Sequence, residues 1–228
     1  MKKTYASCIL SCFLISILLS GCAALPEKKP EAIEKKEAKP PYKEPVYTKE
    51  QKETLDIFTQ ILEIYESAES RQAAAQEAEV LYTRIITEYP DTPLAQESYW
   101  KLIEMSVRDY SPPDFEKAEA YYNEFMTKYP SSVLKNAVDQ TLITKYVRHA
   151  RWERLLKFCT PPFMEFKDEG KEPTPQVVFM YSEANYRLGN IIEAEEGYKA
   201  AMELYPTLSY GKRAKKRLEE IKQKEEKQ

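Results

Sequence analysis

The chain of 228 residues has little of what most enzyme sites require. It contains one histidine, five glycines and four cysteines, and none of its glycines is grouped into a phosphate-binding loop. No histidine and cysteine cluster has the spacing of metal ligands. Adjacent carboxylates such as Glu195 and Glu196 fall on an expected exposed helix, where they solvate the surface instead of forming an acid/base pair. We therefore expect no enzyme activity, no metal and no cofactor.

The single histidine and the one internal cysteine are also poorly placed for nucleophilic catalysis. His149 and Cys159 are ten residues apart along one expected helix, which separates them by about 15 Å. That distance prevents the hydrogen bond that a cysteine nucleophile needs with its base. Because Cys159 stands beside Leu155, Leu156 and Phe158, we expect it to be a small buried residue, with a redox or intermolecular role as the alternative.

The other three cysteines lie in a short apolar segment at the N-terminus or directly after it. Met1-Lys2-Lys3 is a positive start, and the apolar run from Tyr5 to Leu19 has only 15 residues, fewer than the roughly 20 that span a membrane. Leu19-Ser20-Gly21-Cys22 follows it. This arrangement resembles a bacterial lipoprotein signal peptide over residues 1–21 with its lipobox. The resemblance implies cleavage before Cys22 and lipidation of that residue.

The segment after the lipobox differs sharply in composition. Residues 23–50 are rich in proline, lysine, glutamate and alanine, so they bury too little apolar surface to offset the entropy of ordering. We expect residues 22–50 to form a lipidated, solvated tether. Ala23 after the lipidated cysteine resembles the pattern that sends enteric lipoproteins to the outer membrane.

Charge argues against nucleic acid as a partner. Removal of the signal peptide takes away Lys2 and Lys3, which reduces the basic residues from 34 to 32 against 37 acidic ones. A net charge of about −5 does not attract a phosphate backbone.

A repeated pattern dominates the rest of the chain. Ala-Glu, two residues, Tyr, six residues and Tyr-Pro occur three times, starting at Ala78, Ala118 and Ala194. The copies are separated by 40 and then 76 residues, so a degenerate copy is expected in the longer gap. Self-similarity at such a period indicates stacked supersecondary units.

Each copy has the pattern of a helix that ends before a proline. In the third copy one helical face collects Ala194, Tyr198, Ala201 and Tyr205. The alanines permit close helix approach and the tyrosines fill the groove beyond, and Pro206 cannot donate the next helical hydrogen bond. A helix-like stretch from Val177 to Leu188 precedes this copy and ends at Gly189-Asn190, a turn signal between antiparallel helices.

This unit resembles the tetratricopeptide repeat (TPR). The third copy matches best, with Gly189 at the turn and Pro206 after the second helix, whereas the first two lack the turn glycine. A fourth copy can be drawn with Ala150 opening a second helix and Pro162 closing it, although Arg154 then occupies the aromatic position. The resemblance implies an all-α solenoid of three to four helix pairs plus a polar C-terminal capping helix, within a domain over residues 51–224.

Candidate binding residues follow from the same resemblance, because TPR arrays line a groove with the first helix of each pair. The resemblance implies that Trp100, Tyr110, Tyr186 and Arg187 are candidates for binding a partner peptide. Tyr110 and Tyr186 stand at equivalent places in their repeats. The alternative is that the aromatic residues pack between helices.

A basic stripe is the other candidate surface. Around Trp152, a positive residue recurs every third position at Lys145, Arg148, Arg151 and Arg154. It is either a solvated face or a docking site for an acidic partner.

Together these features predict a lipid-anchored adaptor at the outer membrane that faces the periplasm and binds envelope proteins or peptides, with no nucleic acid and no small-molecule substrate. The combination resembles BamD-type lipoproteins of the outer-membrane β-barrel assembly machinery. The alternatives are a TPR lipoprotein associated with a pilus or secretin, one associated with Tol-Pal or peptidoglycan, a structural envelope linker, and a substrate-capturing subunit of a transporter or hydrolase.

Overall fold

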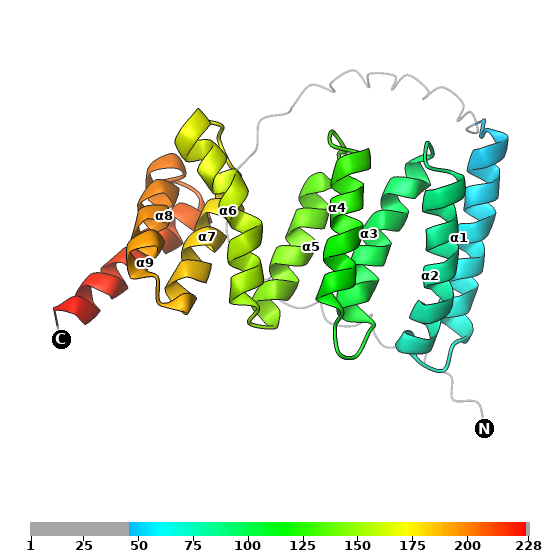
Figure 1. The fold of residues 1–228 in the computed structure, drawn as a ribbon, viewed down its shortest axis with the longest axis horizontal. Coiled ribbons are helices and arrows are strands. Elements are labelled where there is room, and N and C mark those ends of the chain that lie inside the picture. Colours follow the sequence, from blue (N-terminus) through cyan, green and yellow to red (C-terminus); the bar gives the residue numbers. More distant parts are fainter. Residues whose placement is uncertain (1–45, 227–228) are drawn as a thin grey trace, which may run out of the picture. The chain divides into compact units, whose positions relative to one another are not determined.

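The computed structural model describes residues 46–226, so the expected signal peptide, Cys22 and nearly all of the tether lie outside the described residues. Within that range the chain forms nine α-helices and no strand (Figure 1). They are α1 (Lys49–Ser67), α2 (Arg71–Glu88), α3 (Pro93–Arg108), α4 (Phe115–Lys128), α5 (Lys135–Arg148), α6 (Trp152–Glu169), α7 (Pro175–Leu188), α8 (Ile191–Leu204) and α9 (Ser209–Glu225).

The helices pack as consecutive pairs, as expected of an all-α solenoid. The pairs α1/α2, α3/α4 and α7/α8 are closely packed, and each second helix except α4 also packs against the first helix of the following pair. Contacts of α3 with α1 and α5 join the first helices of the first three pairs, and α7 contacts the capping helix α9. The pair α5/α6 is looser, and α5 touches α4 only lightly. Four pairs followed by α9 therefore confirm the predicted fold class.

The repeated residues occupy the positions that their spacing predicts. α2, α4 and α8 each end one residue before the tyrosine of Tyr-Pro, and the amide of that tyrosine still bonds the carbonyl four residues earlier. The face predicted for the third copy is buried in full, at Ala194, Tyr198, Ala201 and Tyr205. Gly189 ends α7 in the left-handed conformation, with φ of 86°, which favours glycine because it has no Cβ.

The prediction for the degenerate copy was wrong in register. Pro162 does not close the helix, because α6 continues through Pro161 and Pro162 to a left-handed Gly170. Ala150 does not open it either. It lies in the turn before α6 with φ of 52°, and the amide of Arg151 bonds the carbonyl of Tyr146 at 2.8 Å.

Ala150 is instead the counterpart of the turn residue Gly189, after which the amide of Asn190 bonds a carbonyl five residues earlier at 2.9 Å. Counting from the two turns places Leu155 where α8 has an alanine, and Cys159 where α8 has its buried tyrosine. Both side chains are fully buried. A leucine and a cysteine have replaced an alanine and a tyrosine, which conceals the repeat in the sequence.

His149 and Cys159 do not share a helix, contrary to the prediction. His149 is the C-terminal cap of α5 and packs edge-on against Phe115, whereas Cys159 is buried in α6. Burial raises the pKa of the Cys159 thiol well above its usual range.

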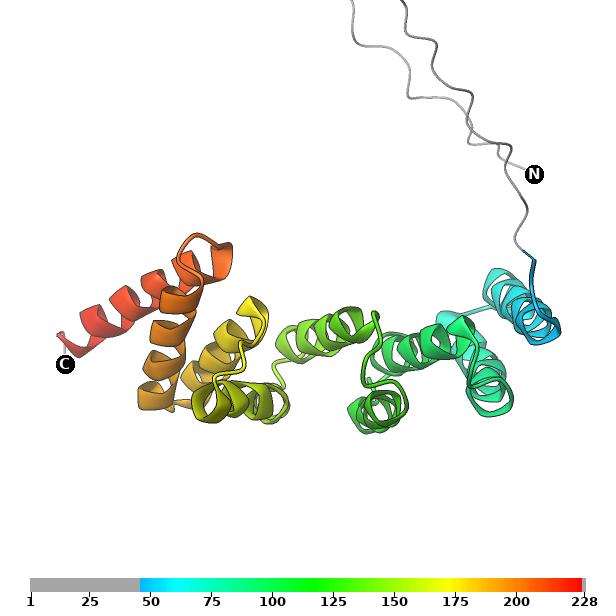
Figure 2. The same cartoon turned by 90° about the horizontal axis from the view of Figure 1, so that it is seen from above.

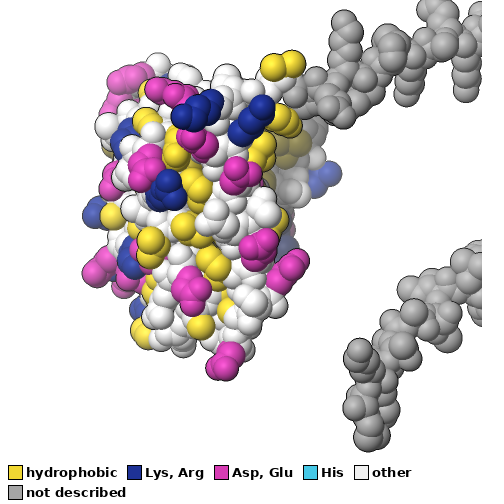
Figure 3. Space-filling view, turned by 90° about the vertical axis from the view of Figure 1, so that its right-hand side faces the viewer, with side chains coloured by type: hydrophobic (Ala, Val, Ile, Leu, Met, Phe, Trp, Pro, Cys, Tyr) yellow, Lys and Arg dark blue, Asp and Glu magenta, His cyan; other side chains and the backbone are white. Residues whose placement is uncertain are grey.

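The two ends of the helical unit differ in polarity. α9 turns a charged face to solvent, as expected for a capping helix. The opposite end, formed by α1 and α2, shows a stripe of apolar side chains (Figure 3), and Leu55, Leu62 and Val80 are 39%, 60% and 68% exposed. Among residues 46–226, no helix is long and apolar enough to cross a membrane.

Candidate binding groove

A groove opens where the regular packing of pairs is interrupted. α4 and α6 stand apart on the same side of α5 (Figure 2), and a cavity of about 620 Å³ lies between them. α5 forms its floor, α4 and α6 form its walls, and the connection from α6 to α7 forms one end. We call it the α4–α6 groove. Its apolar and aromatic lining includes Tyr122, Met126, Leu142, Tyr146, Phe158, Pro161 and Pro162.

One polar network stands beside the floor of the groove and joins all three helices. The hydroxyl of Tyr146 donates to Glu119 Oε1 at 2.7 Å, and Arg154 Nη1 donates to Glu119 Oε2 at 2.8 Å. Both oxygens of this carboxylate are therefore occupied. Burial and the hydrogen bond to Glu119 raise the pKa of Tyr146 well above its usual range. The network fixes α4 to both α5 and α6.

A second network stands further along the floor. The hydroxyl of Tyr122 donates to Asp139 Oδ1 at 2.9 Å, and Lys135 Nζ donates to Asp139 Oδ2 at 2.7 Å. Burial and the charge of Asp139 raise the pKa of Tyr122 well above its usual range. Both tyrosines keep their protons at any physiological pH.

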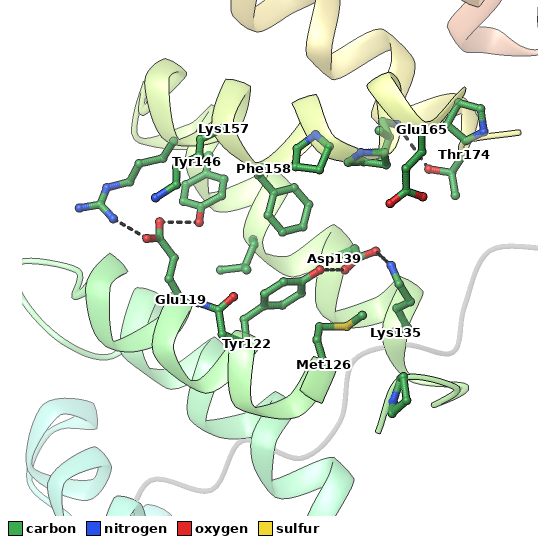
Figure 4. A pocket seen from close by; sticks show the side chains of 18 of the residues that line it. Glu119, Tyr122, Met126, Lys135, Asp139, Tyr146, Lys157, Phe158, Glu165 and Thr174 are labelled. Atoms are coloured by element: carbon green, nitrogen blue, oxygen red, sulfur yellow. Dashed lines mark hydrogen bonds and ion pairs between the residues drawn. The ribbon is translucent and has the colours of Figure 1, made fainter. Parts of the chain in front are cut away.

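Aromatic surface lies between the two networks. Figure 4 shows Phe158 projecting from α6 into the space between Tyr122 and Tyr146. Its ring centroid is 5.2 Å from that of Tyr122 and 6.2 Å from that of Tyr146. Phe158 remains partly exposed, so the centre of the groove offers apolar area with charged groups at its margins.

The wall formed by α6 has an additional property. Proline has no backbone N–H, so Pro161 and Pro162 cannot donate helical hydrogen bonds to the carbonyls of Lys157 and Phe158. All four residues line the groove. The α6 wall therefore carries two backbone acceptors that lack their helical i+4 donors.

In the first two copies, the glutamate of the repeated Ala-Glu dipeptide joins successive pairs, whereas Glu195 of the third copy binds Lys199 within α8. Glu79 in α2 accepts hydrogen bonds from Tyr110, Lys117 and Tyr121 of the following pair. Burial alone would raise the pKa of Glu79, but these three donors outweigh it and lower the pKa. Glu119 occupies the same place in α4 and binds Tyr146 and Arg154 of the next pair.

The candidates proposed from the sequence do not form one surface. Trp100 Nε1 donates to Thr141 Oγ1 at 3.0 Å, between α3 and α5. Tyr110 lies after α3 and bonds Glu79 on α2. Tyr186 bonds Lys224 of α9 at 2.5 Å, and the guanidinium of Arg187 lies 5.4 Å from the ring centroid of Trp152. These contacts favour the packing alternative for the three aromatic residues.

Tyr110 and Tyr186 are not structurally equivalent, although 76 residues separate them as in the repeat. α3 ends at Arg108, so Tyr110 leaves the helix and turns back to α2, whereas Tyr186 remains inside α7 and faces α9. Sequence reasoning missed the α4–α6 groove. The adjacent prolines inside the degenerate copy were the available signal for it.

The site has no feature of a metal centre within residues 46–226, where no group of three histidine, cysteine, aspartate or glutamate side chains could hold an ion. Comparisons of the chain with protein-family models, with curated proteins and with solved structures found no match.

Proposed function

We propose that this protein is a non-catalytic scaffold that binds an extended segment of a partner protein in the α4–α6 groove. The observation that carries this proposal is the combination of a cavity of about 620 Å³ with a floor of aromatic and apolar side chains and two fixed polar networks. Binding sites of this kind bury apolar side chains and use a few placed polar groups for orientation.

The α6 wall favours an extended backbone as the occupant. A peptide in a helix has already paired its amides internally, whereas an extended peptide offers free N–H donors. The carbonyls of Lys157 and Phe158 are acceptors without helical donors, and recognition of an extended chain commonly uses such backbone bonds.

The cellular setting of the proposal comes from the N-terminal segment. We propose that Cys22 is lipidated, that the tether separates the helical unit from the outer membrane, and that the occupant is an envelope protein in the periplasm. The lipobox and the TPR-like repeats support a role like that of BamD-type assembly lipoproteins. A pilus, secretin, Tol-Pal or peptidoglycan-synthesis partner would support the corresponding alternative, and a structural linker would have no groove-bound partner.

The test is site-specific photo-crosslinking in living cells. A photo-reactive amino acid at Asn123 or Lys157 samples opposite walls of the groove, and one at Ala120 samples the exposed surface of α4 outside the groove. We expect positions 123 and 157 to capture the same envelope protein and position 120 to capture none of it.

A variant that blocks the groove adds a complementation test, which does not need the photo-reactive amino acid. Asn123→Trp fills the groove from an exposed position, and Ala120→Trp adds the same bulk to the same helix outside it. Asn123→Trp should abolish the adduct at position 157 and fail to complement a deletion, while Ala120→Trp behaves as wild type. Full function of a stably folded Asn123→Trp protein would refute the proposed role of the groove.

A further inference from the structure

A second surface gathers positive charge away from the groove. Lys145 and Arg148 lie in the last turn of α5, Arg151 follows in the turn before α6, and Arg187 lies in the last turn of α7. The guanidinium of Arg187 covers Trp152 with 5.4 Å between it and the ring centroid. We call these five residues the basic–aromatic patch.

The structure changes the membership of the stripe expected from the sequence. Arg154 leaves it, because its guanidinium binds Glu119 at 2.8 Å and Glu116 at 3.3 Å on the groove side. Arg187, which is 33 residues further along the chain than Arg154, joins the patch from α7. The patch therefore comes from two helix pairs and could not be defined by spacing alone.

Little in the folded chain neutralises this charge. Within residues 46–226, Lys145, Arg148 and Arg151 have no carboxylate within the 4.0 Å of an ion pair, and Arg187 approaches Glu183 only at 4.0 Å. Glu104 and Asp109 face Lys145, but both already bind Arg108 at 2.7 Å.

Two of the cations, Lys145 and Arg148, also lie close enough to repel each other. Burial, followed by the charges of Arg148 and Arg108, lowers the pKa of Lys145. Like charges held together without counter-charges are a cost to the folded protein that an anionic partner would relieve.

The attraction between cations and the negative C-terminal end of a helix explains only part of the patch. Cations in a last turn are stabilised by the negative C-terminal end of the helix, which accounts for Lys145, Arg148 and Arg187. Arg151 lies beyond the end of α5, where its guanidinium is 5.8 Å from the ring centroid of Phe115. The positive patch also stands out on a chain whose net charge is −3.

We infer that the basic–aromatic patch binds an acidic segment of a protein partner. Carboxylates of such a segment would pair with Arg148, Arg151 and Arg187, and an apolar side chain between them would pack on Trp152. Arginine and tryptophan are the residue types in which binding energy concentrates at protein interfaces. This surface acts independently of the α4–α6 groove.

The test uses the full chain purified in an uncharged detergent. The probe is a fluorescent peptide with six consecutive glutamates and one phenylalanine, and its binding is measured by fluorescence anisotropy. The control is the same peptide with lysines in place of the glutamates. We expect saturable binding of the glutamate peptide alone, which weakens as salt rises because the contacts are ionic.

Matched variants assign binding to the patch. Arg148→Gln, Arg151→Gln and Arg187→Gln together should weaken the glutamate peptide about tenfold or more. Lys212→Gln, Lys215→Gln and Lys222→Gln on the exposed face of α9 remove the same charge and should change affinity less than about twofold. Replacing the three arginines by lysine keeps the charge and should retain most of the binding.

Three results would overturn the inference. Equal weakening in both triple variants would show that only net charge matters. Binding to phosphatidylglycerol vesicles but not to the glutamate peptide would assign the patch to a membrane surface. No measurable binding of the peptide at low salt by the folded wild-type chain would remove the site. Loss of peptide binding with normal crosslinking in the groove would leave the proposed function unaffected.

Discussion

Replacement of Tyr198 tests the packing on which the whole array depends. The side chain is fully buried, its ring centroid lies 5.8 Å from that of Phe179, and its hydroxyl donates to Glu183 Oε1 at 2.8 Å. Tyr198→Ala removes the ring and leaves a cavity between α7 and α8, so it should lower the free energy of unfolding by about 3–5 kcal/mol.

Two further substitutions separate packing from hydrogen bonding. Tyr198→Phe keeps the ring and loses one bond to a carboxylate that still accepts from Arg217 Nε at 2.6 Å, so it should cost only about 1–2 kcal/mol. Glu196→Ala breaks an ion pair with Lys167 between side chains that are 47% and 37% exposed, so it should lower the free energy of unfolding less than either Tyr198 variant, because solvent screens exposed ion pairs.

Urea unfolding of the helical unit, residues 46–228, followed by circular dichroism at the helical band, measures all three variants. The reasoning requires the order Tyr198→Ala, then Tyr198→Phe, then Glu196→Ala. Equal costs for the alanine and phenylalanine variants would mean that the hydroxyl, and not the buried ring, holds α7 and α8 together.

Four other outcomes follow from single residues. Gly211→Ala would place a Cβ 2.0 Å from the carbonyl oxygen of Tyr205, so it should cost about 3 kcal/mol or more and make α9 sensitive to trypsin in limited proteolysis. Cys159 should resist a thiol reagent in the folded protein and react fully in urea, because burial raises its pKa; fast labelling of the native state would contradict its burial. The lowered pKa of Glu79 means that its contribution to stability is present above the unfolded pKa and is lost as pH falls through the folded pKa. Glu79→Gln should therefore lose less stability than wild type between neutral and strongly acidic pH, and parallel pH profiles would disprove this. Intact mass of the membrane fraction should show a mature N-terminus at a lipidated Cys22, and an unmodified cysteine would refute the anchor.

The sequence by itself determined the local elements of this protein. Tyr-Pro stops a helix wherever the proline follows the last turn, because the missing N–H and the ring clash act within four residues. For this reason α2, α4 and α8 end where predicted. The burial of the small and aromatic residues of α8 could also be predicted, since helical periodicity alone places them on one face.

Tertiary structure decided what those elements enclose. Pro162 was expected to end a helix, but α6 continues through Pro161 and Pro162 and buries Phe163 beyond. Ala150 adopts a left-handed turn, which costs a residue with a Cβ about 1–2 kcal/mol, and the amide of Arg151 bonds the carbonyl of Tyr146 across that turn at 2.8 Å.

The surfaces proposed here depend on distances between helices that sequence spacing does not encode. Glu119 gains its partners Tyr146 and Arg154 only when three helices meet, which removes Arg154 from the basic stripe. Arg187 comes to Trp152 from the next pair. A periodic pattern specifies which face of one helix is buried, but the approach of non-neighbouring helices depends on how all the side chains between them pack.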